Sequence, residues 1–81
     1  MMVKMEVFGG GCPKCKQVEK NSHEALAQLQ MKGEIVAVKD QVTILQRGVT
    51  STPALAINGA VKCMGRIPET PEIVTWLKEL Q

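Results

Sequence analysis

The residues best suited to chemistry are two cysteines, Cys12 and Cys15, separated by two residues. They stand between a short apolar run at 3–8, which alternates as a β-strand does, and a helical pattern. Three glycines at 9–11 end the strand. Pro13 suits the first position of a helix, because its missing N–H would have no partner there and its φ is already helical. Cys12 is therefore predicted at or beside the helix N-cap, where unpaired N–H groups and the helix dipole favour a thiolate.

This placement predicts a redox-active dithiol. Helix N-termini and C-x-x-C contexts lower the pKa of a thiol from about 8.5 to roughly 3.5–7.5. Lys14 adds a nearby positive charge that modestly favours the thiolate, although salt screens it. Cys15 follows almost one helical turn later, on the same side and within reach of Cys12. Exchange needs one exposed thiol and one sheltered thiol, so we expect Cys12 to attack a disulfide and Cys15 to resolve the mixed disulfide.

Length and composition set the broad class of the chain. Eighty-one residues make one small domain, taken here as 1–81, and a hydrophobic fraction of 44% is that of a globular protein. The net charge of +2 is too small to imply nucleic acid as a partner. The only basic residues that cluster recur along one predicted helix and form a solvated face: Lys14, Lys16 and Lys20.

The N-terminal residues MMVKMEVF are a strand pattern without the apolar region or the small-residue cleavage site of a signal peptide. No apolar run is long enough to span a bilayer, so we expect no membrane association. A cytoplasmic protein is the default expectation. Three cysteines in a reducing compartment favour a catalytic or metal-binding pair over a structural disulfide framework.

The remaining elements follow from periodicity and from helix stop signals. A helix is predicted from Pro13 to about Met31, ended by Lys32-Gly33. A strand at 34–39, nearly continuous in apolar character, is expected to be buried. Asp40 is expected to cap a short helix that runs to about Arg47 and closes at Gly48. The apolar face of the first helix consists of Val18, Ala25, Leu26 and Leu29.

A hairpin and a last helix complete the order of elements. Strands at 54–57 and 60–64 are joined by Asn58-Gly59, the strongest short hairpin signal. Thr70-Pro71 is expected to cap and begin a helix whose apolar face is Ile73, Val74, Trp76, Leu77 and Leu80. The predicted order is β-α-β-α-β-β-α. Because the first crossover joins parallel strands and the hairpin adds antiparallel ones, we expect an α/β fold with a four-stranded mixed sheet and helices on both faces.

With these elements in place, the chain resembles the thioredoxin superfamily. The resemblance rests on the strand and glycine turn, on Cys12-Pro13-Lys14-Cys15 opening a helix, and on Ser51-Thr52-Pro53-Ala54 before the Asn58-Gly59 hairpin. It covers essentially the whole chain. More narrowly, the chain is similar to the small glutaredoxin-like thioredoxins of bacteria and archaea, called small redox-active disulfide proteins.

The resemblance implies a thioredoxin/glutaredoxin-like fold and a thiol–disulfide oxidoreductase that works through a reversible Cys12–Cys15 disulfide, with Pro13 and Lys14 tuning the thiol pKa. It implies protein disulfide substrates, a thioredoxin-reductase-like electron donor and no cofactor. It also implies a cis bond before Pro53, which would turn the backbone of Thr52 outward to pair with an extended substrate segment. We expect a monomer.

Several positions depart from the related families. Gly11 stands where full-length thioredoxins have a tryptophan, and Lys14 stands where glutaredoxins usually carry an aromatic residue. Glu6 is on the strand that carries the buried acid of thioredoxins, but its side chain cannot be placed from the sequence. The hairpin is followed by Gly65 and Arg66, not by the Gly-Gly and acidic pair that bind glutathione. A protein disulfide is therefore favoured over glutathione.

Two alternatives stay open at this point. Cys12 and Cys15 would hold zinc or a soft monovalent ion if a dimer supplied the second pair of ligands, because tetrahedral zinc needs four. A non-catalytic docking domain would keep the fold without either cysteine. Cys63, predicted about 10 Å from the dithiol across two strands, is expected to be a small buried or half-exposed residue, with a third redox thiol or a dimer-forming thiol as the alternative. His23, some 12 Å along the helix from Cys15, is expected on the surface.

Overall fold

The computed structural model describes residues 2–9 and 13–80, and the structural statements below concern those residues. The first strand, β1 (Val3–Phe8), lies in the interior of the sheet and is buried at almost every position. Its side chains alternate between two faces, as strand geometry requires. Val3, Met5 and Val7 enter one core cluster, whereas Phe8 enters a second. The strand therefore supports a core on each side of the sheet.

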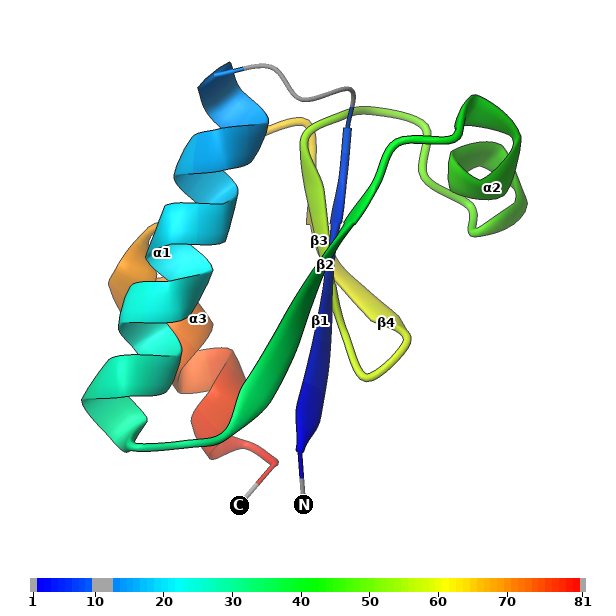
Figure 1. Ribbon diagram of the computed structural model, residues 1–81. Helices are drawn as coiled ribbons and strands as arrows, with labels where there is room; N and C mark the ends of the chain where they lie inside the picture. The colour runs from blue at the N-terminus through cyan, green and yellow to red at the C-terminus, as the bar shows by residue number, and fades with distance from the viewer. Residues whose placement is uncertain (1, 10–12, 81) are drawn as a thin grey trace.

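The sheet has four strands in the order β2-β1-β3-β4 (Figure 1). Strand β2 (Gly33–Val38) runs parallel to β1, and β3 (Ala54–Ile57) runs antiparallel to it. Strand β4 (Ala60–Met64) pairs with β3 through the predicted hairpin. Asn58 and Gly59 at its turn both have positive φ, 50° and 87°. The predicted mixed sheet and element order are confirmed.

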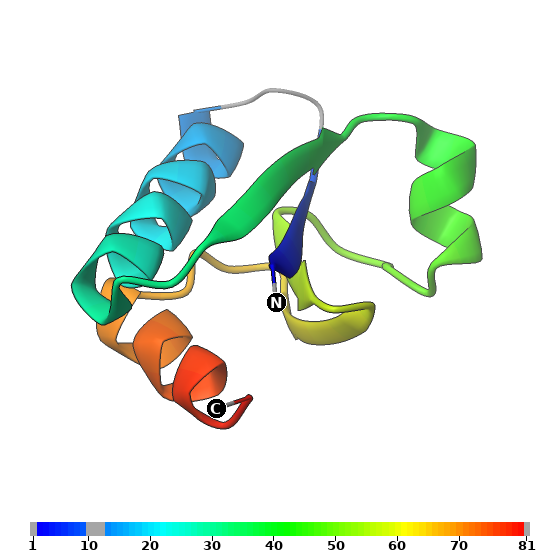
Figure 2. The same cartoon turned by 60° about the horizontal axis from the view of Figure 1, so that its bottom comes forward.

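Helices cover both faces of the sheet. Helices α1 (Pro13–Leu29) and α3 (Thr70–Lys78) pack side by side on one face, and α2 (Gln41–Gln46) lies on the other (Figures 1 and 2). The buried side chains of α1 are Cys15, Val18, Ser22, Ala25 and Leu26. Helix α2 begins as predicted, because Asp40 caps it by accepting hydrogen bonds from the backbone N–H and the hydroxyl of Thr43.

Two expectations about the chain between α1 and β2 are wrong. Helix α1 ends at Leu29, where Gln30 takes a left-handed φ of 53° and the N–H of Met31 donates to the carbonyl of Leu26. This is a helix stop of the Schellman type, and it leaves Gly33 as the first residue of β2. Strand β2 is also not buried, because it lies at the edge of the sheet and pairs with β1 alone.

The cap of the last helix, α3, differs from the predicted one. Its N-cap is Glu69, and Thr70 is the first helical residue. The backbone N–H of Glu69 donates to the carboxylate of Glu72, so an acidic side chain closes this end in place of a threonine hydroxyl. Ile73 and Leu77 are buried as predicted, whereas Leu80 lies beyond the end of the helix and is 45% exposed.

Candidate functional site

Cys15 is held in the first turn of α1, which begins at Pro13 as predicted. Its side chain is buried, with 4% of the residue exposed, and belongs to the core cluster that contains Val7 and Val18. Pro13 and Lys14 are exposed at the start of the same helix. The sheltered character predicted for Cys15 is therefore present. Cys12, the predicted nucleophile, lies outside the described residues.

Gly9 lies directly against the sulfur of Cys15. It follows β1, and its N–H donates to the carbonyl oxygen of Val38 at 3.0 Å. A Cβ atom on Gly9 would overlap Sγ of Cys15 and would lie 3.9 Å from Cβ of Thr52. Cys15, Gly9 and Thr52 therefore meet at one point, although they come from three different segments of the chain. A glycine is required here because any side chain would displace the sulfur.

Thr52 and Pro53 precede β3 at the end of the sheet where β1 also finishes. The register brings Ala54, the residue after Pro53, opposite Phe8. The Thr52–Pro53 peptide bond is cis, as the resemblance implied. Pro53 is buried and its carbonyl oxygen accepts from the N–H of Gly65 at 2.9 Å, whereas Thr52 is exposed. The structure thus brings Thr52 and Pro53 to the same end of the molecule as Cys15.

A pocket of about 60 Å³ opens beside Cys15, between the start of α1 and the ends of β1 and β2. Sequence reasoning missed two of its three charged residues, Glu19 and Lys39, and assigned the third, Lys16, to a solvated helix face. Glu19 stands four residues after Cys15, which is one helical turn, and this spacing is the signal that would have found it. The pocket is lined by Val7, Gly9, Cys15, Lys16, Glu19, Ala37 and Lys39.

Glu6 faces away from Cys15. On β1 it alternates with Val7, so its carboxylate lies on the face covered by α2, where Nη1 and Nη2 of Arg47 each donate to one carboxylate oxygen at 2.7 Å. The Arg47 guanidinium also lies over the ring of Phe8, 5.5 Å from its centroid. These hydrogen bonds hold the pKa of Glu6 below its ordinary value, despite burial. Glu6 therefore anchors α2 and is not an acid behind Cys15.

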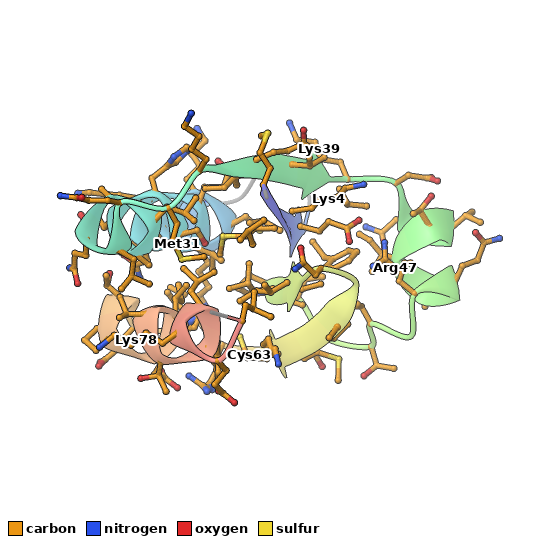
Figure 3. All side chains as sticks on the ribbon, turned by 90° about the horizontal axis from the view of Figure 1, so that it is seen from below. Lys4, Met31, Lys39, Arg47, Cys63 and Lys78 are labelled. Carbon is orange, nitrogen blue, oxygen red and sulfur yellow. The ribbon has the colours of Figure 1, made fainter. Side chains whose placement is uncertain are left out.

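Cys63 is buried on β4, opposite Leu55, and its Sγ lies 3.9 Å from the carbonyl oxygen of Arg66. Figure 3 shows Cys63 between β4 and α3, whereas Arg47 lies on the opposite side of the sheet, beside α2. Burial raises the pKa of the Cys63 thiol above its ordinary value. Arg66 is engaged in a bidentate pair with Glu72, so it stabilises the start of α3.

Two further predictions concern metal and membrane. Within residues 2–9 and 13–80, no group of three or more histidine, cysteine or acidic side chains is placed to hold a metal ion. His23 is exposed on α1, as expected. In the same part of the chain, none of the helices combines the length and the apolar character needed to cross a bilayer.

The chain is similar to known proteins in sequence and in fold. The family model described as "Thioredoxin domain" matches residues 3–78. A thioredoxin of Methanothermobacter thermautotrophicus is 39% identical over 72 residues, which cover 89% of this chain and 94% of the relative. A thioredoxin of Methanocaldococcus jannaschii is 38% identical over 78 residues, covering 96% of this chain and 90% of the relative.

Solved structures show the same fold at lower identity. One is the structure of thioredoxin-2, which is described as a component of malaria parasite protein secretion machinery. It superposes with a TM-score of 0.69 at 13% identity, over 96% of this chain and 82% of that chain. A dimeric thioredoxin-like protein from Nitrosomonas europea gives a TM-score of 0.58 at 23% identity, over 90% of this chain and 96% of that chain. On the family match and the two archaeal relatives, this chain belongs to the thioredoxin family and has the thiol–disulfide oxidoreductase kind of function of that family.

Proposed function

We propose that this protein exchanges disulfides with other proteins through a reversible disulfide between Cys12 and Cys15. The observation that carries the proposal is the position of Cys15, whose buried sulfur lies against Gly9 and beside Thr52 at the start of α1. A resolving thiol needs this combination of shelter and fixed position, because it must react with a neighbouring sulfur and not with solvent reagents.

The reaction balances without a cofactor. The thiolate of Cys12 attacks one sulfur of a substrate disulfide, and the other substrate sulfur leaves as a thiolate that takes a proton from water. The thiol of Cys15 then loses its proton, and its sulfur attacks Sγ of Cys12. The second substrate sulfur leaves in the same way. The substrate disulfide gains two electrons and two protons, and the protein dithiol becomes a disulfide.

The surroundings of Cys15 favour a protein substrate. Thr52 is exposed beside the sulfur, and an extended segment carrying a disulfide would find its backbone N–H and carbonyl groups there. The hairpin is followed by Gly65 and Arg66 in place of the Gly-Gly and acidic pair that bind glutathione, and Arg66 is engaged by Glu72. We propose a protein dithiol donor of the thioredoxin-reductase kind for the return reaction, and a monomeric single domain acting in the cytoplasm.

A pair of trapping variants tests the proposal. In Cys15→Ser, the mixed disulfide on Cys12 has no resolving thiol and should accumulate as covalent adducts that a reductant releases. Cys12→Ser should form none. A protein with one defined, intact disulfide, such as a small secreted hormone, serves as the substrate for the reduced form of both variants. If Cys12→Ser captures the substrate while Cys15→Ser does not, the roles are reversed, and if neither does, the exchange function is wrong.

A further inference from the structure

The pocket beside Cys15 contains an acidic side chain, Glu19, to which the proposed reaction has so far given no role. Cys15 must lose a proton before its sulfur can attack, yet its thiol is buried, and burial in a core disfavours a thiolate. A group that accepts this proton during the attack would remove that obstacle. It must come within reach of Cys15 directly or through water, on the same side of the sheet.

Glu6 is excluded from this task by its position. Its carboxylate lies on the α2 face and is held by both guanidinium nitrogens of Arg47. The acid that shares a pocket with Cys15 is Glu19, one turn later on α1 and half-buried. Residues four apart lie on the same face of a helix, so the two side chains point into the pocket together. A pocket of about 60 Å³ also has room for water between them.

We propose that Glu19 accepts the proton of Cys15 when the mixed disulfide is resolved. This inference rests on the proposed dithiol function. The carboxylate takes the Cys15 proton through water in the pocket while the Cys15 sulfur bonds to Sγ of Cys12, and the substrate sulfur leaves with the electron pair of the broken bond. Glu19 then returns the proton to solvent at the open side of the pocket.

Two lysines complete the arrangement. Lys16, on α1, and Lys39, just after β2, line the same pocket and place positive charge beside both the carboxylate and the developing thiolate. His23 stands one turn further along α1 from Glu19 and is exposed. The ionisable groups around Glu19 are therefore Lys16 and His23 from its own helix and Lys39 from the residue after β2. The two lysines place positive charge that opposes the negative charge of Glu19 beside the sulfur.

A release experiment isolates the step. The reduced protein is mixed with a symmetrical aromatic disulfide whose thiolate is coloured, and the release of this thiolate is followed by absorbance. The first equivalent is released when Cys12 attacks the disulfide. The second equivalent is released when Cys15 closes the disulfide with Cys12. Because the leaving thiolate needs no proton, the second rate depends on the loss of the proton from Cys15. All variants carry Cys63→Ala, so that the only thiols are the two of the motif.

Glu19→Gln keeps the size of the side chain and removes the accepting group. Its second release should slow on the order of tenfold or more in mildly acidic buffer, as general-base loss does, while the first release stays within about twofold. The difference should shrink in alkaline buffer, where hydroxide removes the proton. Glu34→Gln, which removes the same charge from the exposed start of β2, is the control and should match the parent at every pH.

The direction in which Glu19→Gln changes the second release rate distinguishes a proton acceptor from a simple negative charge. If Glu19 acted only as a nearby negative charge, it would disfavour the Cys15 thiolate, and Glu19→Gln would speed the second release. A faster or unchanged second release in Glu19→Gln therefore overturns the proposal. Absence of any second release in the parent protein would instead overturn the dithiol function, so the two failures are distinguishable.

Discussion

Gly9 and Cys15 are packed so closely that a Cβ atom on Gly9 would occupy the position of the Cys15 sulfur. Gly9→Ala should therefore turn Sγ of Cys15 away from its place at the start of α1. Since a misplacement of about 1 Å costs on the order of a hundredfold in a positioned reaction, closure of the Cys12–Cys15 disulfide should slow between about tenfold and a hundredfold. The second phase of coloured thiolate release measures this rate of closure.

Gly48→Ala is the matched control for Gly9→Ala. Gly48 has a φ of +78°, which strains any other residue, but a Cβ there would meet nothing within 4 Å. This variant should lower the free energy of unfolding while the rate of disulfide closure stays that of the parent. Equal closure rates in Gly9→Ala and the parent would show that the sulfur position is not restricted by this contact.

The ion pair between Glu6 and Arg47 should contribute to stability at neutral pH. Arg47→Gln leaves the buried Glu6 carboxylate without its bidentate partner, and an unsatisfied buried charged group costs about 1–3 kcal/mol or more. Urea unfolding of the parent and Arg47→Gln measures the difference, and thiol–disulfide exchange in the same variant should be unchanged, because Glu6 faces α2.

The effect of Arg47→Gln should depend on pH in a defined direction. The pKa of Glu6 is lowered in the folded protein, chiefly by the hydrogen bonds from Arg47. A carboxyl pKa that is lower in the folded state adds stability at any pH above the pKa of the unfolded state, and this stability is lost as the pH falls through the pKa of the folded state. The difference in free energy of unfolding between the parent and Arg47→Gln should therefore become smaller in acid. A gap that widens in acid would contradict the assignment.

The start of α3 should resist acid for the same reason. Hydrogen bonds from Arg66 and from the N–H of Glu69 lower the pKa of Glu72 to about 2. Its carboxyl carbon should therefore keep the chemical shift of the ionised form until the solution nears that pH, as an NMR titration can follow. In Arg66→Gln the midpoint should move up toward that of an ordinary glutamate. An ordinary midpoint in the parent would show that this pair does not form in solution.

Cys63 should take no part in the redox chemistry. It is 9% exposed, and burial raises the pKa of its thiol, so little thiolate is present near neutral pH. In the folded, reduced protein Cys63 should alkylate far more slowly than Cys12, and it should label fully only after unfolding. Mass spectrometry of the labelled protein locates the modified residues. Exchange activity lost in Cys63→Ala, with the fold intact, would contradict this prediction.

Most of the fold could be predicted because its signals are local. The Asn58-Gly59 turn, the cap at Asp40 and the proline at the start of α1 each act through the geometry of a few neighbouring residues, and all three appear in the structure. The two helix ends that were predicted differently, the end of α1 and the beginning of α3, depend on backbone conformations that many sequences could adopt. Gln30 adopts a left-handed φ without being glycine, and Glu69 replaces the expected threonine as cap.

The site was only partly predictable, because its members meet through packing between distant segments. The sequence placed Cys15 at the start of a helix and linked Thr52 to it by resemblance. It could not show that Gly9 touches the sulfur, since that contact depends on how the end of β1 packs against the first turn of α1. Nor could it pair Glu6 with Arg47, 41 residues away, or bring Lys39 to the pocket of Cys15.

The most direct test of the dithiol function is an equilibrium redox titration of the purified protein in defined thiol buffers, with zinc content measured beforehand. The protein is unfolded after equilibration, and the mass added by thiol labelling is measured. Cys12 and Cys15 should lose their labels together in one two-electron step, while Cys63 keeps its own. If Cys12 and Cys15 never pair, or if they release metal when they are labelled, the dithiol function is contradicted and the metal-binding alternative takes its place.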